Sequence, residues 1–118
     1  MAALKIAVAG AGLIGRAHMA VMDQSNTCVL AAIADPSDAA KQLAAEKGVP
    51  WFATLEELLA STQPDGVVVA TPNALHVQQA LQCIKAGVPV LVEKPIAHTV
   101  EQAQQLVQVV QDLSLIHI

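Results

Sequence analysis

Short apolar runs alternate with longer amphipathic segments along this chain. Four of the runs are apolar almost without interruption, and they cover residues 5–10, 28–35, 66–71 and 89–94. Such runs are typical of parallel β-strands that are covered on both faces, because a strand with one face in water alternates apolar and polar residues. Trp51 and Phe52 predict a weaker strand between the second and third runs. The pattern therefore predicts a parallel sheet.

The segments between these runs predict helices, since their apolar residues recur at intervals of three and four. The first helix is expected over residues 13–23. The second is expected to have Pro36 in its first turn and to end at Gly48. A third opens at Thr54, with Glu57 in the spacing of a capping box.

Two further helices complete the pattern. One is expected to run from a cap at Asn73 to a glycine stop at Gly87. The other opens at Thr99, with Gln102 in capping-box spacing. Its apolar face is formed by Ala103, Leu106, Val107 and Val110. Strands that alternate with helices indicate right-handed βαβ crossovers, so we expect one α/β domain over residues 1–112.

Composition excludes several classes of protein. The chain has 118 residues, of which 54% are hydrophobic and 14% charged, and this balance excludes intrinsic disorder. The net charge is −4 and the Lys and Arg residues are scattered, so nucleic acid is not expected as a partner. No apolar run approaches the roughly 20 residues of a membrane-spanning helix, and no membrane association is expected.

The two cysteines and the N-terminal residues give information on the cellular compartment of the protein. Cys28 and Cys83 are far apart, without a CxxC motif or a cluster of metal ligands. They predict buried thiols in a reducing, cytoplasmic environment and no metal site. Residues 1–20 also resemble a secretory leader, with Lys5 before an apolar stretch, but glycines interrupt that stretch.

The last six residues, 113–118, depart from the pattern of the helix before them. Their sequence, LSLIHI, resembles the translation of a sequencing-library adapter. We therefore expect a non-native tail and give His117 no functional role.

A glycine-rich loop follows the first expected strand. Gly10, Gly12 and Gly15 have the G-x-G-x-x-G spacing and lie at the start of a helix. The first glycine allows a tight turn, the second lets the backbone approach a pyrophosphate, and the third allows close packing of helix and strand. The helix N-terminus favours the anion. The loop predicts a dinucleotide site in a Rossmann-type, doubly wound parallel sheet.

An acidic residue ends the second expected strand. Asp35 comes about 25 positions after Gly10, where a carboxylate can accept hydrogen bonds from the ribose hydroxyls of the adenosine half. Its alternative role is to cap the helix that follows, and the two roles are compatible. A carboxylate repels a 2′-phosphate, so NAD is expected in preference to NADP.

Polar residues also follow the third and fourth long strands. The segment 70–76 lies at the carboxyl end of its strand, where ligands bind in open α/β sheets. Within it, Asn73 is either a ligand contact or a helix cap, and His76 either a ligand contact or a partly exposed surface residue. His18, on the first helix, is expected to be a packing or surface residue and not a ligand. Glu93 and Lys94 end the fourth run, and Pro95 stops it.

Four motifs in this order, AVAGAGLIGRAH, AIADPS, VVVATPNALH and VLVEKPIAHTVEQAQQL, resemble the N-terminal domain of the Gfo/Idh/MocA oxidoreductases. This is the family of glucose–fructose oxidoreductase and inositol dehydrogenase, and the resemblance extends to Asp112. It implies an NAD(P)-binding Rossmann domain that is normally followed by an α+β domain for the substrate, which this chain lacks. It also implies that Lys94 contacts the substrate or its reacting oxygen, that Glu93 lies on the nicotinamide side, and that Pro95 shapes the turn.

The expected function is the nucleotide-binding half of an NAD-dependent oxidoreductase acting on a sugar, polyol or related hydroxyl compound. The resemblance implies a histidine acid–base partner in the missing domain and a homo-oligomeric full-length protein, so this fragment alone is expected to be inactive. The alternatives are a redox-neutral, NAD-using glycosidase or lyase relative, a non-catalytic NAD-sensing module, and an α/β domain whose glycine turn binds nothing. Lys94 is the expected catalytic residue. The expected cofactor-binding residues are Gly10, Gly12, Leu13, Ile14, Gly15, Asp35, Ala70, Thr71, Pro72, Asn73, His76, Glu93, Lys94 and Pro95.

Overall fold

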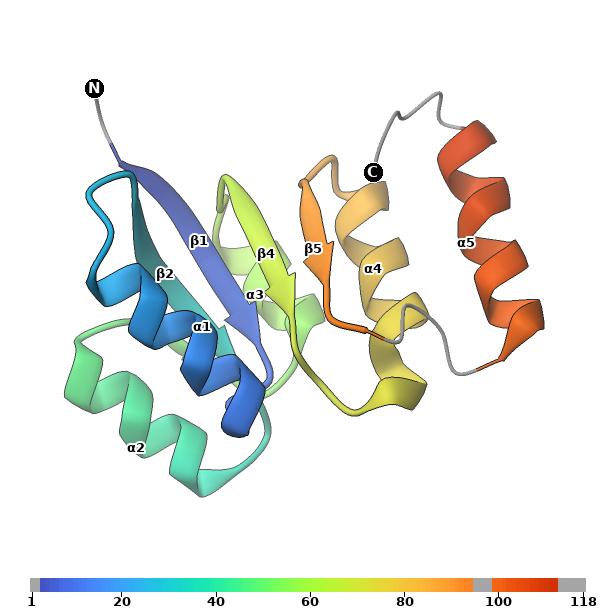
Figure 1. The fold of residues 1–118 in the computed structure, drawn as a ribbon. Helices are drawn as coiled ribbons and strands as arrows, with labels where there is room; N and C mark the ends of the chain where they lie inside the picture. Colours follow the sequence, from blue (N-terminus) through green and yellow to red (C-terminus); the bar gives the residue numbers. More distant parts are fainter. Residues whose placement is uncertain (1–2, 95–98, 113–118) are drawn as a thin grey trace.

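A parallel sheet lies at the centre of the computed structural model, which describes residues 3–94 and 99–112 (Figure 1). Its strands are β1 (Leu4–Ala9), β2 (Cys28–Ala34), β3 (Trp51–Phe52), β4 (Gly66–Val69) and β5 (Val90–Val92). They are hydrogen-bonded in the order β3-β2-β1-β4-β5, and every neighbouring pair is parallel. The five strands expected from the sequence are all confirmed. The four long ones end one or two residues earlier than expected, and β3 covers the expected Trp51 and Phe52.

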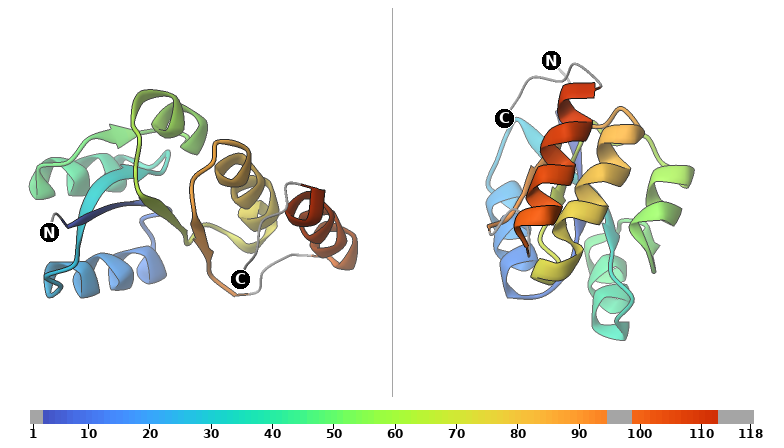
Figure 2. Two further views of the ribbon diagram at one scale, coloured as in Figure 1. Left: turned by 90° about the horizontal axis from the view of Figure 1, so that it is seen from above. Right: turned by 90° about the vertical axis from the view of Figure 1, so that its right-hand side faces the viewer.

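Helices cover both faces of this sheet, which makes it doubly wound (Figure 2). α1 (Leu13–Asp23) and α2 (Asp38–Lys47) pack on one face through a core that includes Val8, Met19 and Ile33. α3 (Leu55–Ser61) and α4 (His76–Lys85) pack on the other, where Leu58 and Cys83 are fully buried. The chain is therefore the single α/β Rossmann-type domain that the sequence predicts.

The ends of α2 and α3 are set by their polar residues. Pro36 was expected in the first turn of α2, and this is wrong: the helix begins at Asp38, and Ser37 is its N-cap, accepting a hydrogen bond from Ala40 N–H at 3.1 Å. The Ser37 hydroxyl satisfies an N–H that proline could not. Gly48 ends α2 with a φ of 70°, and Thr54 caps α3 as expected.

The start of α4 also differs from the expectation. A 3₁₀ turn, η1 (Asn73–Leu75), comes first, and Leu75 is the N-cap residue of α4, without a side-chain cap. The expected Asn73 cap on this α-helix is therefore wrong, because the turn continues for three residues before the α-helical hydrogen bonds begin. Gly87 follows the helix with a φ of 74°, as expected of a glycine stop.

α5 (Val100–Asp112) packs against α4 at the β5 side of the sheet (Figures 1 and 2). Thr99 accepts a hydrogen bond from Gln102 N–H at 3.2 Å, which confirms the expected cap. Val107 belongs to the expected apolar face but is 55% exposed, and Leu91 on β5 is 57% exposed. Apolar side chains therefore remain uncovered along this side of the molecule.

The segment that resembles a secretory leader contributes β1 and α1, at the centre of the fold. Both cysteines are free; Cys83 is buried, and burial raises the pKa of its thiol to about 12. Cys28 is only half-buried, contrary to the expectation, because it opens the outer half of β2. Within the described ranges, no helix has the length and hydropathy needed to cross a membrane. The expected tail, residues 113–118, lies outside these ranges.

Candidate functional site at the carboxyl edge of the sheet

The carboxyl ends of the strands meet at one edge of the sheet, where α1 also begins (Figure 1). The first crossover leads from β1 to β2 on one side, while β4 lies beside β1 on the other. This reversal of strand order creates a topological switch point, the position at which open α/β sheets bind their ligands. Asp35 follows β2 and Lys94 follows β5, so three strand spacings, about 14 Å, separate their positions.

Two of the three loop glycines are required by the protein itself. Gly10 has a φ of +98°, and a Cβ there would lie 2.6 Å from the carbonyl oxygen of Ala70. A Cβ on Gly15 would lie 1.8 Å from the carbonyl oxygen of Gly10. Such contacts are impossible, so these glycines allow the loop after β1 to pack against α1 and against the segment after β4.

Gly12 differs from these two, because a Cβ there would meet no protein atom within 4 Å. Its φ of −78° and ψ of −163° are extended backbone that any residue can adopt. Gly12 is exposed at the N-cap of α1, followed by Leu13 and Ile14, which are 86% and 49% exposed. The first turn of α1 carries no acidic residue, and an α-helix leaves its first N–H groups without intrahelical partners. The loop therefore suits a group of negative charge that approaches its backbone closely.

Asp35 lies beside this loop and is bonded to it. Its Oδ2 accepts a hydrogen bond from Ala11 N–H and its Oδ1 one from Ser37 N–H, each at 2.8 Å. Burial alone would raise the pKa of the carboxyl, but these hydrogen bonds and the charge of Arg16 outweigh it and lower the pKa. A carboxylate has about four acceptor positions, so both oxygens can still accept hydrogen bonds from hydroxyl groups.

The backbone of Asp35 is fixed from behind by β3. Its N–H donates to the carbonyl of Phe52 at 3.0 Å, and its carbonyl accepts from Trp51 Nε1–H at 2.8 Å. The Nζ of Lys41 lies 5.2 Å from the centre of the Trp51 ring, within cation–π range. The position of Asp35 is thus set by a sheet contact and an indole, and Trp51 is a fluorescent reporter next to it.

The segment after β4 is held by hydrogen bonds to α4. Ala70 N–H donates to the carbonyl of Ala9 at 2.8 Å. The Thr71 hydroxyl donates to Gln79 Oε1, and the Thr71 carbonyl accepts from His76 Nε2 at 2.8 Å. His76 is only 1% exposed, so the alternative of a partly exposed surface residue is wrong. It bonds the backbone of the loop that carries Thr71.

Within this segment, Pro72 is exposed and Asn73 begins the 3₁₀ turn. The two residues therefore lie at the carboxyl edge, as expected. They follow Ala70, whose carbonyl oxygen lies against Gly10 of the glycine loop.

Glu93 and Lys94 follow β5 at the same edge. Glu93 N–H donates to the carbonyl of Val69 at 3.0 Å, and Lys94 is exposed. The Glu93 carboxylate pairs with His18 Nε2 on α1. The hydrogen bond from His18 lowers the pKa of Glu93, against a smaller opposite effect of burial. Pro95 lies outside the described residues.

His18 is a residue that sequence reasoning missed. It was expected to serve packing or the surface, and 75 positions separate it from Glu93. No local spacing links the two residues, because only the placement of α1 relative to β5 brings them together.

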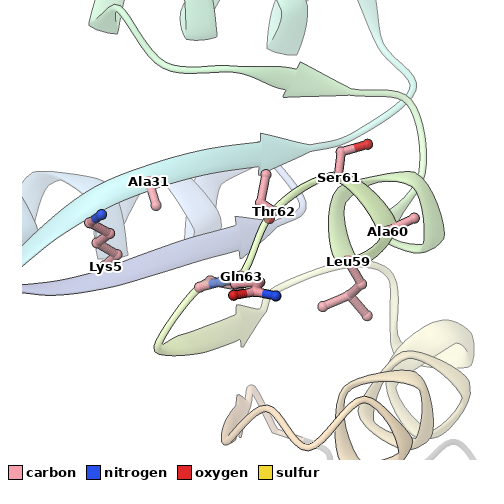
Figure 3. A pocket seen from close by; sticks show the side chains of 8 residues that line it. Lys5, Ala31, Leu59, Ala60, Ser61, Thr62 and Gln63 are labelled. Atoms are coloured by element: carbon pink, nitrogen blue, oxygen red, sulfur yellow. The ribbon is translucent and has the colours of Figure 1, made fainter.

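Two hollows in the molecule lie away from this edge. One, of about 600 Å³, is lined by Lys5, Ala31 and residues 59–64, near the start of β1 (Figure 3). The other, of about 370 Å³, lies beside the end of α1 and the start of β2. Both are at the amino ends of the strands, whereas ligands of parallel sheets bind at the carboxyl ends, so we assign neither a role. In the described part of the chain, no three His, Cys, Asp or Glu residues are grouped to hold a metal ion.

The strand order, the glycine loop and the acid after β2 together define the class of dinucleotide-binding Rossmann domains. Comparison with known proteins agrees: the family described as "Oxidoreductase family, NAD-binding Rossmann fold" (GFO_IDH_MocA) matches residues 4–117. The chain belongs to this family, the Gfo/Idh/MocA oxidoreductases, and is an NAD-binding domain of it.

Individual relatives support the assignment. The rhizopine catabolism protein MocA of Rhizobium meliloti is 31% identical over 109 residues, which are 92% of this chain and 34% of the relative. The scyllo-inositol dehydrogenase of Lactobacillus casei, solved with NAD(H) and scyllo-inositol, superimposes with a TM-score of 0.89 at 25% identity, over 96% of this chain and 34% of that one. The WlbA dehydrogenase of Bordetella pertussis, solved with NADH and UDP-GlcNAcA, gives a TM-score of 0.88 at 30% identity, over 96% and 36%. The chain thus spans about a third of the length of the curated relatives it matches.

Proposed function

We propose that this chain is the nucleotide-binding part of an oxidoreductase that uses NAD to oxidise or reduce a sugar, polyol or related hydroxyl compound. The observation that carries the proposal is Gly12: the protein has no steric need of a glycine there, so the need comes from a ligand that approaches the loop. The polyol and nucleotide-sugar ligands of the two structural neighbours support the substrate class.

The residues of this chain have separate tasks in the proposal. Gly10, Gly12 and Gly15, with Leu13 and Ile14, receive the pyrophosphate at the start of α1. Asp35 accepts hydrogen bonds from the hydroxyls of the adenosine ribose. Residues 70–73, supported by His76, line the path of the nicotinamide half together with Glu93 and Lys94. Pro95, outside the described residues, stays a predicted cofactor contact. When bound, NAD supplies the hydride acceptor or donor.

Lys94 is the proposed catalytic residue. Its exposed ammonium follows β5 at the edge where the substrate meets the cofactor. There it can donate a hydrogen bond to the reacting oxygen and stabilise the negative charge that develops as the hydroxyl proton leaves. The substrate domain, the histidine that receives this proton, the homo-oligomer and the cytoplasmic location all concern the full-length protein and remain predictions.

The experiment for catalysis is Lys94→Ala in the full-length protein, with NADH formation measured on a panel of polyols and sugars. We expect turnover to fall at least about a hundredfold while the Kd for NAD changes little, because general acid–base and electrostatic help of this kind contributes about 10² to 10⁴ in rate. Normal turnover in the variant would remove Lys94 from the site. NAD binding without turnover on any substrate in the wild type would favour the sensing alternative.

The preference for NAD is tested by Asp35→Ser. Loss of the carboxylate should weaken NAD about tenfold or more, because it removes charge-assisted hydrogen bonds to the ribose. NADP is the internal control: the lost contact to Ala11 affects both cofactors, whereas lost repulsion of the 2′-phosphate favours NADP alone. An unchanged ratio of the two Kd values would refute the ribose role of Asp35.

A further inference from the structure

The contact between His18 and Glu93 connects α1 to the end of β5. The two side chains are 26% and 29% exposed, so they are largely shielded from water. His18 lies one turn beyond the loop-facing end of α1, and Glu93 is fixed to β4 through the carbonyl of Val69. The pair therefore joins the helix that follows the glycine loop to the segment between β5 and Lys94.

The position of this pair relative to the cofactor follows from the strand order. Asp35 fixes the adenosine ribose on the β2 side of β1, and the glycine loop receives the pyrophosphate at β1 itself. The remaining half of the dinucleotide must then extend to the other side, over the ends of β4 and β5. His18 and Glu93 lie on that side.

The pair also directs the Glu93 carboxylate. Among the side-chain ion pairs formed by residues 3–94 and 99–112, Glu93 is joined to His18 on α1. The backbone N–H and the charge of the adjacent Lys94 lower the pKa of Glu93 less than the hydrogen bond from His18 does. A carboxylate bonded to an imidazole N–H is held more firmly than one in water, because charge-assisted hydrogen bonds are the stronger kind. The strongest contact of the Glu93 carboxylate is therefore with α1.

We propose that His18 is a positioning residue of the cofactor site. Its hydrogen bond to Glu93 holds the start of the Glu93–Lys94 segment in the arrangement that the nicotinamide half of NAD requires. This inference rests on the proposed function. It differs from the simple alternative, a surface pair that contributes only slightly to stability, because it requires His18 to affect one half of the ligand and not the other.

The experiment compares NAD with ADP-ribose, which lacks the nicotinamide. The Kd values of both are measured by calorimetry for the wild type, His18→Leu and His18→Gln, together with the melting temperature of each. A matched control is Asp23→Asn, which removes a second ion pair of α1, between Asp23 at its end and Lys47 of α2 at 3.1 Å. That pair lies at the opposite end of α1 from the glycine loop.

We expect His18→Leu to weaken NAD about fivefold to tenfold, the equivalent of one hydrogen bond of this kind, and to change ADP-ribose less than about twofold. His18→Gln should restore most of the NAD affinity, since its amide can donate to Glu93 at a similar reach. Asp23→Asn should leave both Kd values unchanged. If His18→Leu does not fold, His18→Asn, whose shorter amide reaches less far toward Glu93, is expected to give the same selective loss.

Three results would overturn the inference: NAD affinity unchanged in His18→Leu, equal losses for NAD and ADP-ribose, or no restoration by His18→Gln. The failure of the proposed function has a different signature, because a wild type that binds neither ligand rejects the cofactor site as a whole.

Discussion

The three glycines of the loop after β1 do not all meet the same steric need. Gly10 and Gly15 are needed because a Cβ at either position would collide with backbone oxygen, at 2.6 Å and 1.8 Å. Gly12 has open space beside it, so the packing of the protein does not require a glycine there. The spacing in the sequence suggested a role for each of the three glycines. Only the structure distinguishes the two that packing requires from the one that it does not.

The first prediction uses this contrast. Gly12→Ala should leave the free energy of unfolding within about 1 kcal/mol of the wild type, since the backbone there suits any residue. It should weaken NAD about tenfold or more by keeping the pyrophosphate from the backbone. Gly15→Ala should lower the free energy of unfolding by about 3 kcal/mol, through overpacking. Urea unfolding and calorimetry measure the two effects, and equal destabilisation by both substitutions would contradict the separation.

The second prediction concerns the contribution of Asp35 to stability at low pH. The pKa of Asp35 is lowered in the fold, so its ionised form stabilises the native state. That contribution is complete above the unfolded pKa of about 3.9 and is lost as pH falls through the lower, folded pKa. The melting temperature of the wild type should therefore fall more steeply below about pH 4 than that of Asp35→Asn. Parallel curves for the two proteins would show that the contacts to Ala11 and Ser37 do not stabilise the ionised form.

The side-chain contacts within the site, and the place of His18 in it, could not be found from the sequence. Gly10, Gly12, Gly15 and Asp35 stand at fixed positions within one βαβ unit, so a local pattern predicts where they lie. The contacts of His18 with Glu93 and of His76 with Thr71 depend on how helices pack on strands. Side-chain contacts of this type have no period in the sequence.

At the level of elements, the apolar pattern predicted every strand and α-helix of the described residues. Its errors fall at helix starts, where polar contacts decide. Pro36 was placed inside α2, but Asp35 accepts the Ser37 N–H and Ser37 caps the helix, so proline is left in the turn. At α4 the 3₁₀ turn of Asn73–Leu75 delays the helix. Periodicity carries no information about either contact.

The cap of α2 gives the third prediction. Ser37→Ala should lower the free energy of unfolding by about 1 kcal/mol, because the N–H of Ala40 loses its acceptor. Ser61→Ala is the matched control, since Ser61 is exposed at the end of α3. Urea unfolding measures both. Equal effects of the two substitutions would contradict a capping role for Ser37.

Across the whole molecule, one side of the sheet is less well covered than the other. β5 is hydrogen-bonded to β4 and to no other strand of the described residues. Leu91 on β5 and Val107 on α5 are both more than half exposed. Uncovered edges and apolar surfaces of this kind favour association between chains.

The fourth prediction follows from this surface. Leu91→Lys should reduce self-association of the purified chain, because a charge on an edge strand opposes pairing. Light scattering over a range of concentrations measures the change. Val29→Lys is the control, since Val29 is 46% exposed on β2, a strand with neighbours on both sides. An equal gain from the control would show that net charge, not the β5 edge, governs solubility.

The central claim is that the carboxyl edge of this domain holds NAD between Asp35, the glycine loop and the end of β5. Isothermal calorimetry of the purified chain with NAD and NADP tests it most directly, with the fluorescence of Trp51 as a second signal beside Asp35. The account predicts saturable binding of one NAD per chain, tighter than NADP, and loss of that binding in Gly12→Ala. An absence of heat, of fluorescence change and of thermal stabilisation with either cofactor would contradict it.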